Sequence, residues 1–437
     1  GLIGAIGVGI AFLFTPLLLP IILSFGSYNG AKKAESNTDL IYKMLRFCNH
    51  LSGIPMGGES SINRRRCRRV LLSGLLIGMF SMVAATKLNV WHDPLTWFAE
   101  DDPVRVSYGI VDQALGGASF LSLVLECNSE QGFKNLKTLK SLEALENALM
   151  KYHDRELNKR VLANPTSILD IVRETRQALN EGREEFYRLP ETQEELNDLF
   201  FLFESASSEQ LRQVLTLDNK VGHMTFSSIW LPANRYAPLT RFVEEQLSNK
   251  HLSNLSIQPT GIVFMFYSTI ANLLQDLLRS FASAFILVSL AMIFVLRDIK
   301  LALISMLPNL LPITMLLGFM AICDIPLDLS SALLGSLALG ICIDDTIHIM
   351  HHFNRHYAKS GNVDESIMAT FTHSGRAIVT TSIILMAGGV IYVFSALSNI
   401  RMFGVLIGLT IFFALIVDLI LTPAVLRAVY ARKPPRA

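Results

Sequence analysis

Seven apolar stretches dominate this 437-residue chain, and each is long enough to cross about 30 Å of hydrocarbon as a helix. Hydrophobic residues make up 51% of the chain and charged residues only 17%, whereas a soluble domain carries about a quarter charged residues. The sequence therefore predicts an α-helical membrane protein with seven transmembrane helices. The stretches lie at roughly 1–25, 70–88, 274–296, 301–323, 330–350, 377–397 and 402–426.

The distribution of lysine and arginine predicts the orientation of these helices, because basic loops stay on the cytoplasmic side. The basic segments are 26–69, 297–300, 351–376 and the tail at 427–437. The short loops between the opposite helix ends hold only Arg401, and the polar segment 89–273 is then one large outer domain. We expect 351–376 to be a loop with a short helix. The RRRCRR run at 64–69 could bind nucleic acid or anionic lipid, but we favour a topology determinant and expect no nucleic-acid partner.

An internal repeat indicates how the chain is organised. Residues 1–24 match residues 404–427 without gaps, and the chain opens on this apolar run without an initiator methionine or a basic leader. We therefore interpret the chain as a fragment that does not begin with a signal peptide. Its first helix would be the last helix of a preceding half, and the other six would form the C-terminal half of a twelve-helix permease with two repeats.

Strand and helix patterns alternate within the outer domain. We predict strands at 119–127, 222–231 and 254–262, and helices at about 134–152, 165–180, 191–204, 208–217 and 236–250. This order favours an α+β, ferredoxin-like domain enlarged by extra helices. We find no nucleophile–base motif and no metal-ligand spacing in it, so an enzyme is the least favoured class. The single histidines are interpreted as surface or packing residues; they are His92, His153, His223 and His251.

Two adjacent aspartates, Asp344 and Asp345, lie inside the apolar stretch at 330–350. An ionised carboxylate costs several kcal/mol in hydrocarbon, so an acid in a transmembrane helix indicates function. Two neighbouring carboxylates also repel, which favours partial protonation, as a proton carrier requires. His348 shares a helix face with Asp344 and His352 follows one turn later, so either could continue a proton route or lie at the interface. A metal site built from these residues lacks a fourth ligand, and we expect no metal and no cofactor other than protons.

The aspartates need polar partners in the membrane. Hydroxyl groups at Thr380 and Thr381, with Ser382 beside them, are the candidates on the next apolar stretch. Asp418 is a third acid in an apolar stretch, either a partner of the pair or a separate polar contact. Asn309 lies between two prolines, where an interrupted helix leaves carbonyl groups free. In the alternative, the pair only holds helices together, but placing two adjacent acids in an apolar environment for this purpose costs much free energy.

Several of these segments together resemble the resistance–nodulation–division (RND) superfamily. Within it, the chain is similar to the lipid and hydrophobe exporters near the MMPL and hopanoid-transporter groups, and the resemblance covers nearly its whole length. The segments are GICIDDTIHIMHHFNRH at 340–356, LISMLPNLLPI at 303–313, DPLTWFAEDDPVR at 93–105, NPTSILDIVRETRQAL at 164–179 and QPTGIVFMFY at 258–267.

The resemblance implies a secondary transporter of the bacterial inner membrane with a large periplasmic porter domain. Inward proton flow would drive export of lipids or other hydrophobic cargo, with Asp344, Asp345, His348, Thr380 and Thr381 in the relay. It also implies an N-terminal half of the same permease as partner, and we expect a homo-oligomer. The best-known drug pumps carry their aspartate pair in the first half, so their scheme does not transfer directly. A sterol-sensing-like lipid receptor or scaffold that does not transport is the alternative, and an accessory motor for protein secretion is a weaker one.

Overall fold

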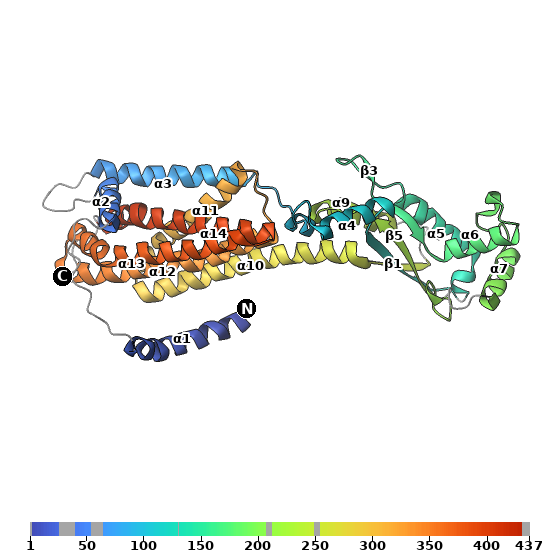
Figure 1. Cartoon of the computed structure of the whole chain (residues 1–437), viewed down its shortest axis with the longest axis horizontal. Coiled ribbons are helices and arrows are strands. Elements are labelled where there is room, and N and C mark those ends of the chain that lie inside the picture. The colour runs from blue at the N-terminus through green and yellow to red at the C-terminus, as the bar shows by residue number, and fades with distance from the viewer. Residues whose placement is uncertain are drawn as a thin grey trace.

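A computed structural model shows an elongated molecule with a helical bundle at one end and a small α/β domain at the other (Figure 1). It describes residues 2–25, 40–53, 64–129, 131–206, 212–248 and 254–430. Helix α10 (Gly261–Leu296) belongs to both parts, because it follows strand β6 (Leu255–Thr260) directly and runs on into the bundle. One continuous helix of 36 residues therefore joins the two ends.

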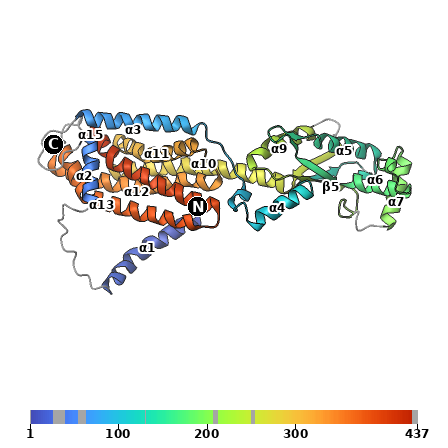
Figure 2. The same cartoon turned by 45° about the horizontal axis from the view of Figure 1, so that its top comes forward.

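The bundle contains the six helices of the described residues that are long and apolar enough to cross a membrane. They are α3 (Arg64–Ala85), α10, α11 (Ile299–Ile322), α12 (Leu329–Ser360), α13 (Val363–Ile391) with η5 (Tyr392–Phe394), and α14 (Ser398–Ile416) continued by η6 (Val417–Leu421) and α15 (Thr422–Tyr430). A seventh span at 1–25 is not confirmed. That stretch is helix α1 (Leu2–Ser24), which includes a shorter apolar helix, Ile6–Leu18, and lies to one side of the bundle (Figure 2).

The connections between the last five of these helices, from α10 to α14, are short. Arg297 adopts a left-handed conformation with φ 52° and Asp298 caps α11, which makes the tight turn expected there. The prediction of a loop at 351–376 is wrong, because α12 continues to Ser360 and α13 starts at Val363. Gly361, with φ +63°, ends one helix and Asn362 caps the next. The RRRCRR run is likewise helical, as the first turns of α3.

The α/β domain is built on a four-stranded sheet with the order β4-β5-β1-β6, in which all neighbouring strands are antiparallel. The strands are β1 (Ser119–Cys127), β4 (Leu162–Thr166), β5 (Val221–Ser228) and β6, with a hairpin of β2 (His153–Asp154) and β3 (Lys159–Arg160) at the side. The helices are α4 (Pro103–Ala114), α5 (Leu136–Leu149), α6 (Ile168–Leu179), α7 (Gln193–Ala206) and α9 (Ala233–Leu247), with short turns η1 (Pro94–Trp97), η2 (Gly132–Lys134) and η3 (Glu184–Phe186). The predicted helix at 208–217 lies partly outside the described residues, and Leu215 bridges to Gly222 instead.

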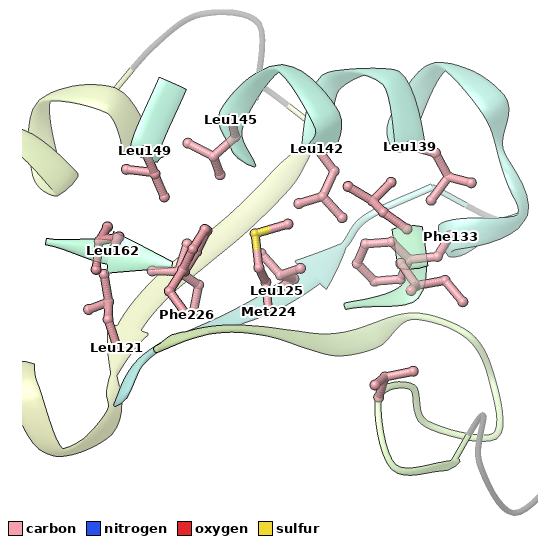
Figure 3. Close-up of a cluster of buried hydrophobic side chains, with 14 of the residues drawn as sticks. Leu121, Leu125, Phe133, Leu139, Leu142, Leu145, Leu149, Leu162, Met224 and Phe226 are labelled. Carbon is pink, nitrogen blue, oxygen red and sulfur yellow. The ribbon is translucent and has the colours of Figure 1, made fainter. Parts of the chain in front are cut away.

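One face of the sheet carries the core of this domain. Side chains alternate along β1, so Leu121, Leu123 and Leu125 are fully buried while Phe120 is 48% exposed. The buried face meets a row of leucines on α5, spaced three or four residues apart (Figure 3). That row contains Leu139, Leu142, Leu145 and Leu149. Buried residues of α6, α7 and α9 join the same cluster, so the core forms between one sheet face and the helices that cover it, separately from the bundle core.

Candidate functional site: carboxylates inside the helical bundle

Helix α12 carries the aspartate pair in its middle. A capping box at Asp328 fixes its beginning, and residues four apart on it share a face. Asp344 accordingly aligns with His348, whose Nε2 lies 3.8 Å from the Asp344 Oδ1. Both side chains point out of the bundle, with 75% of Asp344 and 63% of His348 exposed. This face therefore presents an acid and an imidazole together.

Asp345 points in a different direction, about 100° around the helix from Asp344. It is half-buried, between the buried residues Ile343 and Thr346. Helix α12 packs against α14, which continues into the π-helical turn η6 that carries Asp418. The two adjacent aspartates are thus not equivalent: one faces outward and one faces the interior of the bundle.

Asp418 is the most enclosed acid of the bundle, with 2% of its surface exposed. Thr422 donates a hydrogen bond to its Oδ1 at 3.3 Å. Its Oδ2 is buried and has no hydrogen-bond partner within the part of the chain that the structure describes. The sequence indicated Asp418 as a possible partner of the pair, but not its depth or its π-helical backbone.

A row of hydrogen bonds connects α11 and α12 beside these carboxylates. The Thr346 hydroxyl donates to the Asn309 Oδ1 at 2.7 Å and lies 3.1 Å from the Cys342 carbonyl oxygen. Asn309 in turn donates to the Ser305 carbonyl oxygen at 3.1 Å. Sequence reasoning singled out Asn309 and missed Thr346. The available signal was that Thr346 directly follows the two aspartates, as a third polar residue in an otherwise apolar stretch.

Thr380 and Thr381 lie on α13 with exposed side chains. Each hydroxyl donates to a carbonyl oxygen one turn earlier in its own helix, at 2.8 Å for Thr380 and 3.1 Å for Thr381. Such back-bonding satisfies a hydroxyl in an apolar setting. Neither threonine hydrogen-bonds to Asp344 or Asp345 among the described residues, whereas the adjacent Ser382 is buried.

The histidines of α12 continue past His348 towards the end of the helix. His351 and His352 have ring centroids 5.9 Å apart, and His356 stacks on His373 of α13 at 6.0 Å. Within the described residues, no three histidine, cysteine, aspartate or glutamate side chains are arranged to hold a metal ion. The row therefore offers imidazoles for proton transfer or for interfacial contacts.

The junction between the bundle and the α/β domain contains a buried histidine and a small cavity. His92 is buried between Trp97 and Phe266, with ring centroids 5.5 Å and 6.0 Å away, and burial lowers the pKa of His92. A cavity of about 170 Å³ lies beside it, lined by Trp91, Trp97 and the ends of α12 and α14. His92 is thus a packing residue. Of the other histidines, His153 is exposed, His223 is half-buried in β5, and His251 lies outside the described residues.

Comparison with known proteins places these helices in a wider context. The Patched family, described as Patched SSD, matches residues 271–428, which run from α10 to α15. A membrane protein from Methanocaldococcus jannaschii is 32% identical over 125 residues, which cover 29% of this chain and 32% of that protein. The match thus spans about a third of the length of this relative. The chain is similar to RND-related membrane proteins of the Patched type, which agrees with a membrane protein related to sterols or lipids.

Proposed function

We propose that this chain belongs to a transporter that couples inward proton flow to the export of lipids or other hydrophobic molecules. The observation that carries the proposal is Asp345, a half-buried carboxyl in the middle of α12. Helix α12 packs against α14, whose continuation η6 carries a second, buried acid, Asp418. Ionisable groups in membrane helices are costly and mark ion or proton pathways. A transporter uses such groups, whereas a purely structural helix contact does not require them.

In this proposal Asp344 and Asp345 form the relay, and His348 accepts or donates protons on the Asp344 face. The separation of 3.8 Å between His348 and Asp344 allows a direct ion pair when the imidazole is protonated. Thr380 and Thr381 take part only if their hydroxyls leave the carbonyl groups they now contact.

The wider architecture is part of the same proposal. A second half of the permease, with its own six helices, would cover the exposed face of Asp344 and His348, because charged groups in membrane proteins face the protein interior. The strand order β4-β5-β1-β6, with helices between successive strands, supports a ferredoxin-like porter domain. By the RND resemblance, this chain would contribute seven spans to a twelve-helix permease that forms a homo-oligomer in a bacterial inner membrane. The α/β domain would lie in the periplasm, and the protein would have no enzymatic activity.

A lipid receptor that does not transport is the second candidate function. The match of the Patched SSD family to residues 271–428 favours it as much as it favours transport. The two candidates differ in the use of the pH gradient: a transporter consumes it, and a receptor binds lipid without it. The same residues and the same bundle would serve either role, so only a functional measurement separates them.

The test uses the full-length protein in vesicles that contain a fluorescent phospholipid in the membrane, with an imposed pH gradient. We expect loss of the labelled lipid from the vesicles to a lipid acceptor outside, and we expect Asp344→Asn and Asp345→Asn to abolish it. Asp276→Asn is the matched control, because Asp276 lies on α10 with 67% of its side chain exposed. Unchanged lipid movement in both variants would contradict the proposal, and binding without movement would favour the receptor.

A further inference from the structure

We propose that Asp418 is the innermost proton-binding group of the bundle and exchanges its proton with Asp345. This inference rests on the proposed proton-coupled function and adds a residue that the relay on α12 does not contain. The step moves one proton between the carboxyl of Asp345 and the Oδ2 of Asp418. One carboxylate and one carboxylic acid are present before and after it, so the charge of the pair does not change.

The surroundings of Asp418 favour a bound proton. Its side chain is 2% exposed, and its Oδ2 has no hydrogen-bond partner among the described residues. Among the described residues, the ionisable groups that interact electrostatically with Asp418 are Asp345 and the Cys342 thiol, both on α12, and neither supplies a positive charge. A buried carboxylate without a cation or a full set of hydrogen bonds is strongly disfavoured. A proton on Oδ2 removes this cost and leaves Oδ1 to accept the hydrogen bond from Thr422.

The backbone at Asp418 gives it this position. Residues Val417–Leu421 form a π-helical turn, in which the Thr422 N–H bonds to the Val417 carbonyl oxygen. Pro423 follows and has no N–H to continue the regular α-helical pattern. Such π-bulges are frequent at functional sites. The wider turn therefore places the Asp418 carboxyl in the bundle interior with Thr422 beside it.

The experiment is infrared spectroscopy of the full-length protein in vesicles, where a protonated buried carboxyl has a distinct C=O stretching band. We expect this band at neutral pH, with the shift in D₂O that marks an exchangeable proton. Asp418→Asn should remove it, and Thr422→Val should shift it, because the hydrogen bond to Oδ1 is lost. Asp364→Asn should keep it, since Asp364 is paired with Arg427 at 3.2 Å.

Two outcomes overturn the inference: no such band in the wild-type protein, or an unchanged band in Asp418→Asn. If Asp418→Asn does not fold, an unchanged band position in Thr422→Val overturns it instead. Asp345→Asn tests the route, because hydrogen–deuterium exchange of the Asp418 proton should slow, and an equal rate would contradict exchange through Asp345. The band does not depend on transport. A protein that shows the band but no proton-coupled transport would contradict only the proposed function. A protein that transports but lacks the band would contradict only this inference.

Discussion

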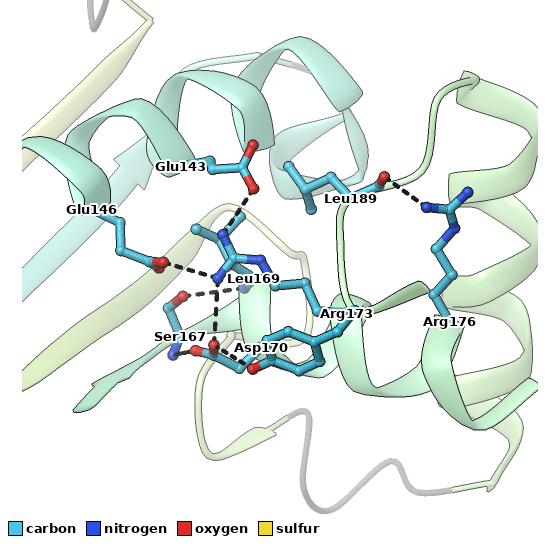
Figure 4. A network of polar contacts seen from close by, with 9 residues as sticks. Glu143, Glu146, Ser167, Leu169, Asp170, Arg173, Arg176 and Leu189 are labelled. Atoms are coloured by element: carbon cyan, nitrogen blue, oxygen red, sulfur yellow. Dashed lines mark hydrogen bonds and ion pairs between the residues drawn. The ribbon is translucent and has the colours of Figure 1, made fainter. Parts of the chain in front are cut away.

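Replacing Arg173 by methionine tests how the α/β domain holds its buried charges. The Arg173 guanidinium is 2.8 Å from a carboxylate oxygen of Glu143 and 2.8 Å from one of Glu146, and Asp170 lies 3.5 Å away (Figure 4). Glu146 is 5% exposed, and its second oxygen has no hydrogen-bond partner among the described residues. Removing the arginine therefore leaves a buried carboxylate without its cation.

Breaking such a buried pair costs about 3–5 kcal/mol, which we expect as the loss of unfolding free energy at neutral pH. Burial raises the pKa of Glu146, and the hydrogen bond and charge of Arg173 oppose that rise. Without Arg173 the pKa of Glu146 rises further above its ordinary 4.5. A folded-state pKa above the unfolded-state pKa stabilises the fold at pH values below the unfolded-state pKa. This stabilisation is lost as the pH rises through the folded-state pKa. The defect should therefore be small in acid and grow towards neutral pH.

Urea unfolding of the full-length protein measures this effect. This chain has three tryptophans. Trp230 packs on Tyr108 within the α/β domain, and Trp91 and Trp97 lie at its junction with the bundle. Their fluorescence therefore reports unfolding of the domain and of its junction. Arg183→Met is the matched control, because Arg183 is 54% exposed and its ion pairs are worth about 0–1 kcal/mol. An Arg173→Met defect below about 1 kcal/mol, or one that does not change with pH, would refute the role of Arg173 as the compensating charge.

Three further predictions concern packing and hydrogen bonds. Tyr236→Phe should cost about 1–3 kcal/mol in the same urea assay, because the buried hydroxyl accepts a backbone N–H at 3.1 Å that would lose its partner; full stability would contradict this. Gly117→Ala should lower the free energy of unfolding by about 1–3 kcal/mol, since a Cβ there would clash with the backbone of Ser228. An unchanged midpoint would show that the strands can separate. Thr346→Val should lower the thermal stability of the bundle by about 0.6 kcal/mol through the lost bond to Asn309, measured by heating in detergent, and greater stability would exclude a stabilising bond.

Much of the fold could be predicted from local patterns. The β1 alternation, the leucine row of α5 and the Asn164–Ser167 helix start are all readable in the sequence, and Ser167 indeed caps α6. Two of the features that local patterns missed have clear physical causes. The chain at 351–376 is polar enough to look like a loop, yet only Gly361 and Asn362 interrupt the helices. Strand β4 is short and irregular, with Asn164 in a left-handed conformation, so it carries almost no strand signal.

The candidate site could be predicted only in part. An acid in an apolar stretch is visible in a sequence, which is why Asp344, Asp345 and Asp418 all stood out. Which of them faces inward depends on the rotation of each helix in the bundle. The contact between Thr346 and Asn309 joins two helices that are 37 residues apart in the chain, and no local pattern encodes it. The π-helical turn at Val417–Leu421 is equally invisible, because it is a small backbone change within a uniformly apolar run.

The most direct test of the central claim is the internal pH of vesicles that contain the full-length protein and a trapped pH-sensitive dye. After an acid pulse outside, with the membrane potential clamped, we expect the interior to acidify faster than in vesicles without protein. Asp345→Asn should return the rate to that of empty vesicles, and Asp276→Asn should not. Acidification at the wild-type rate in Asp345→Asn would contradict proton movement through this carboxyl.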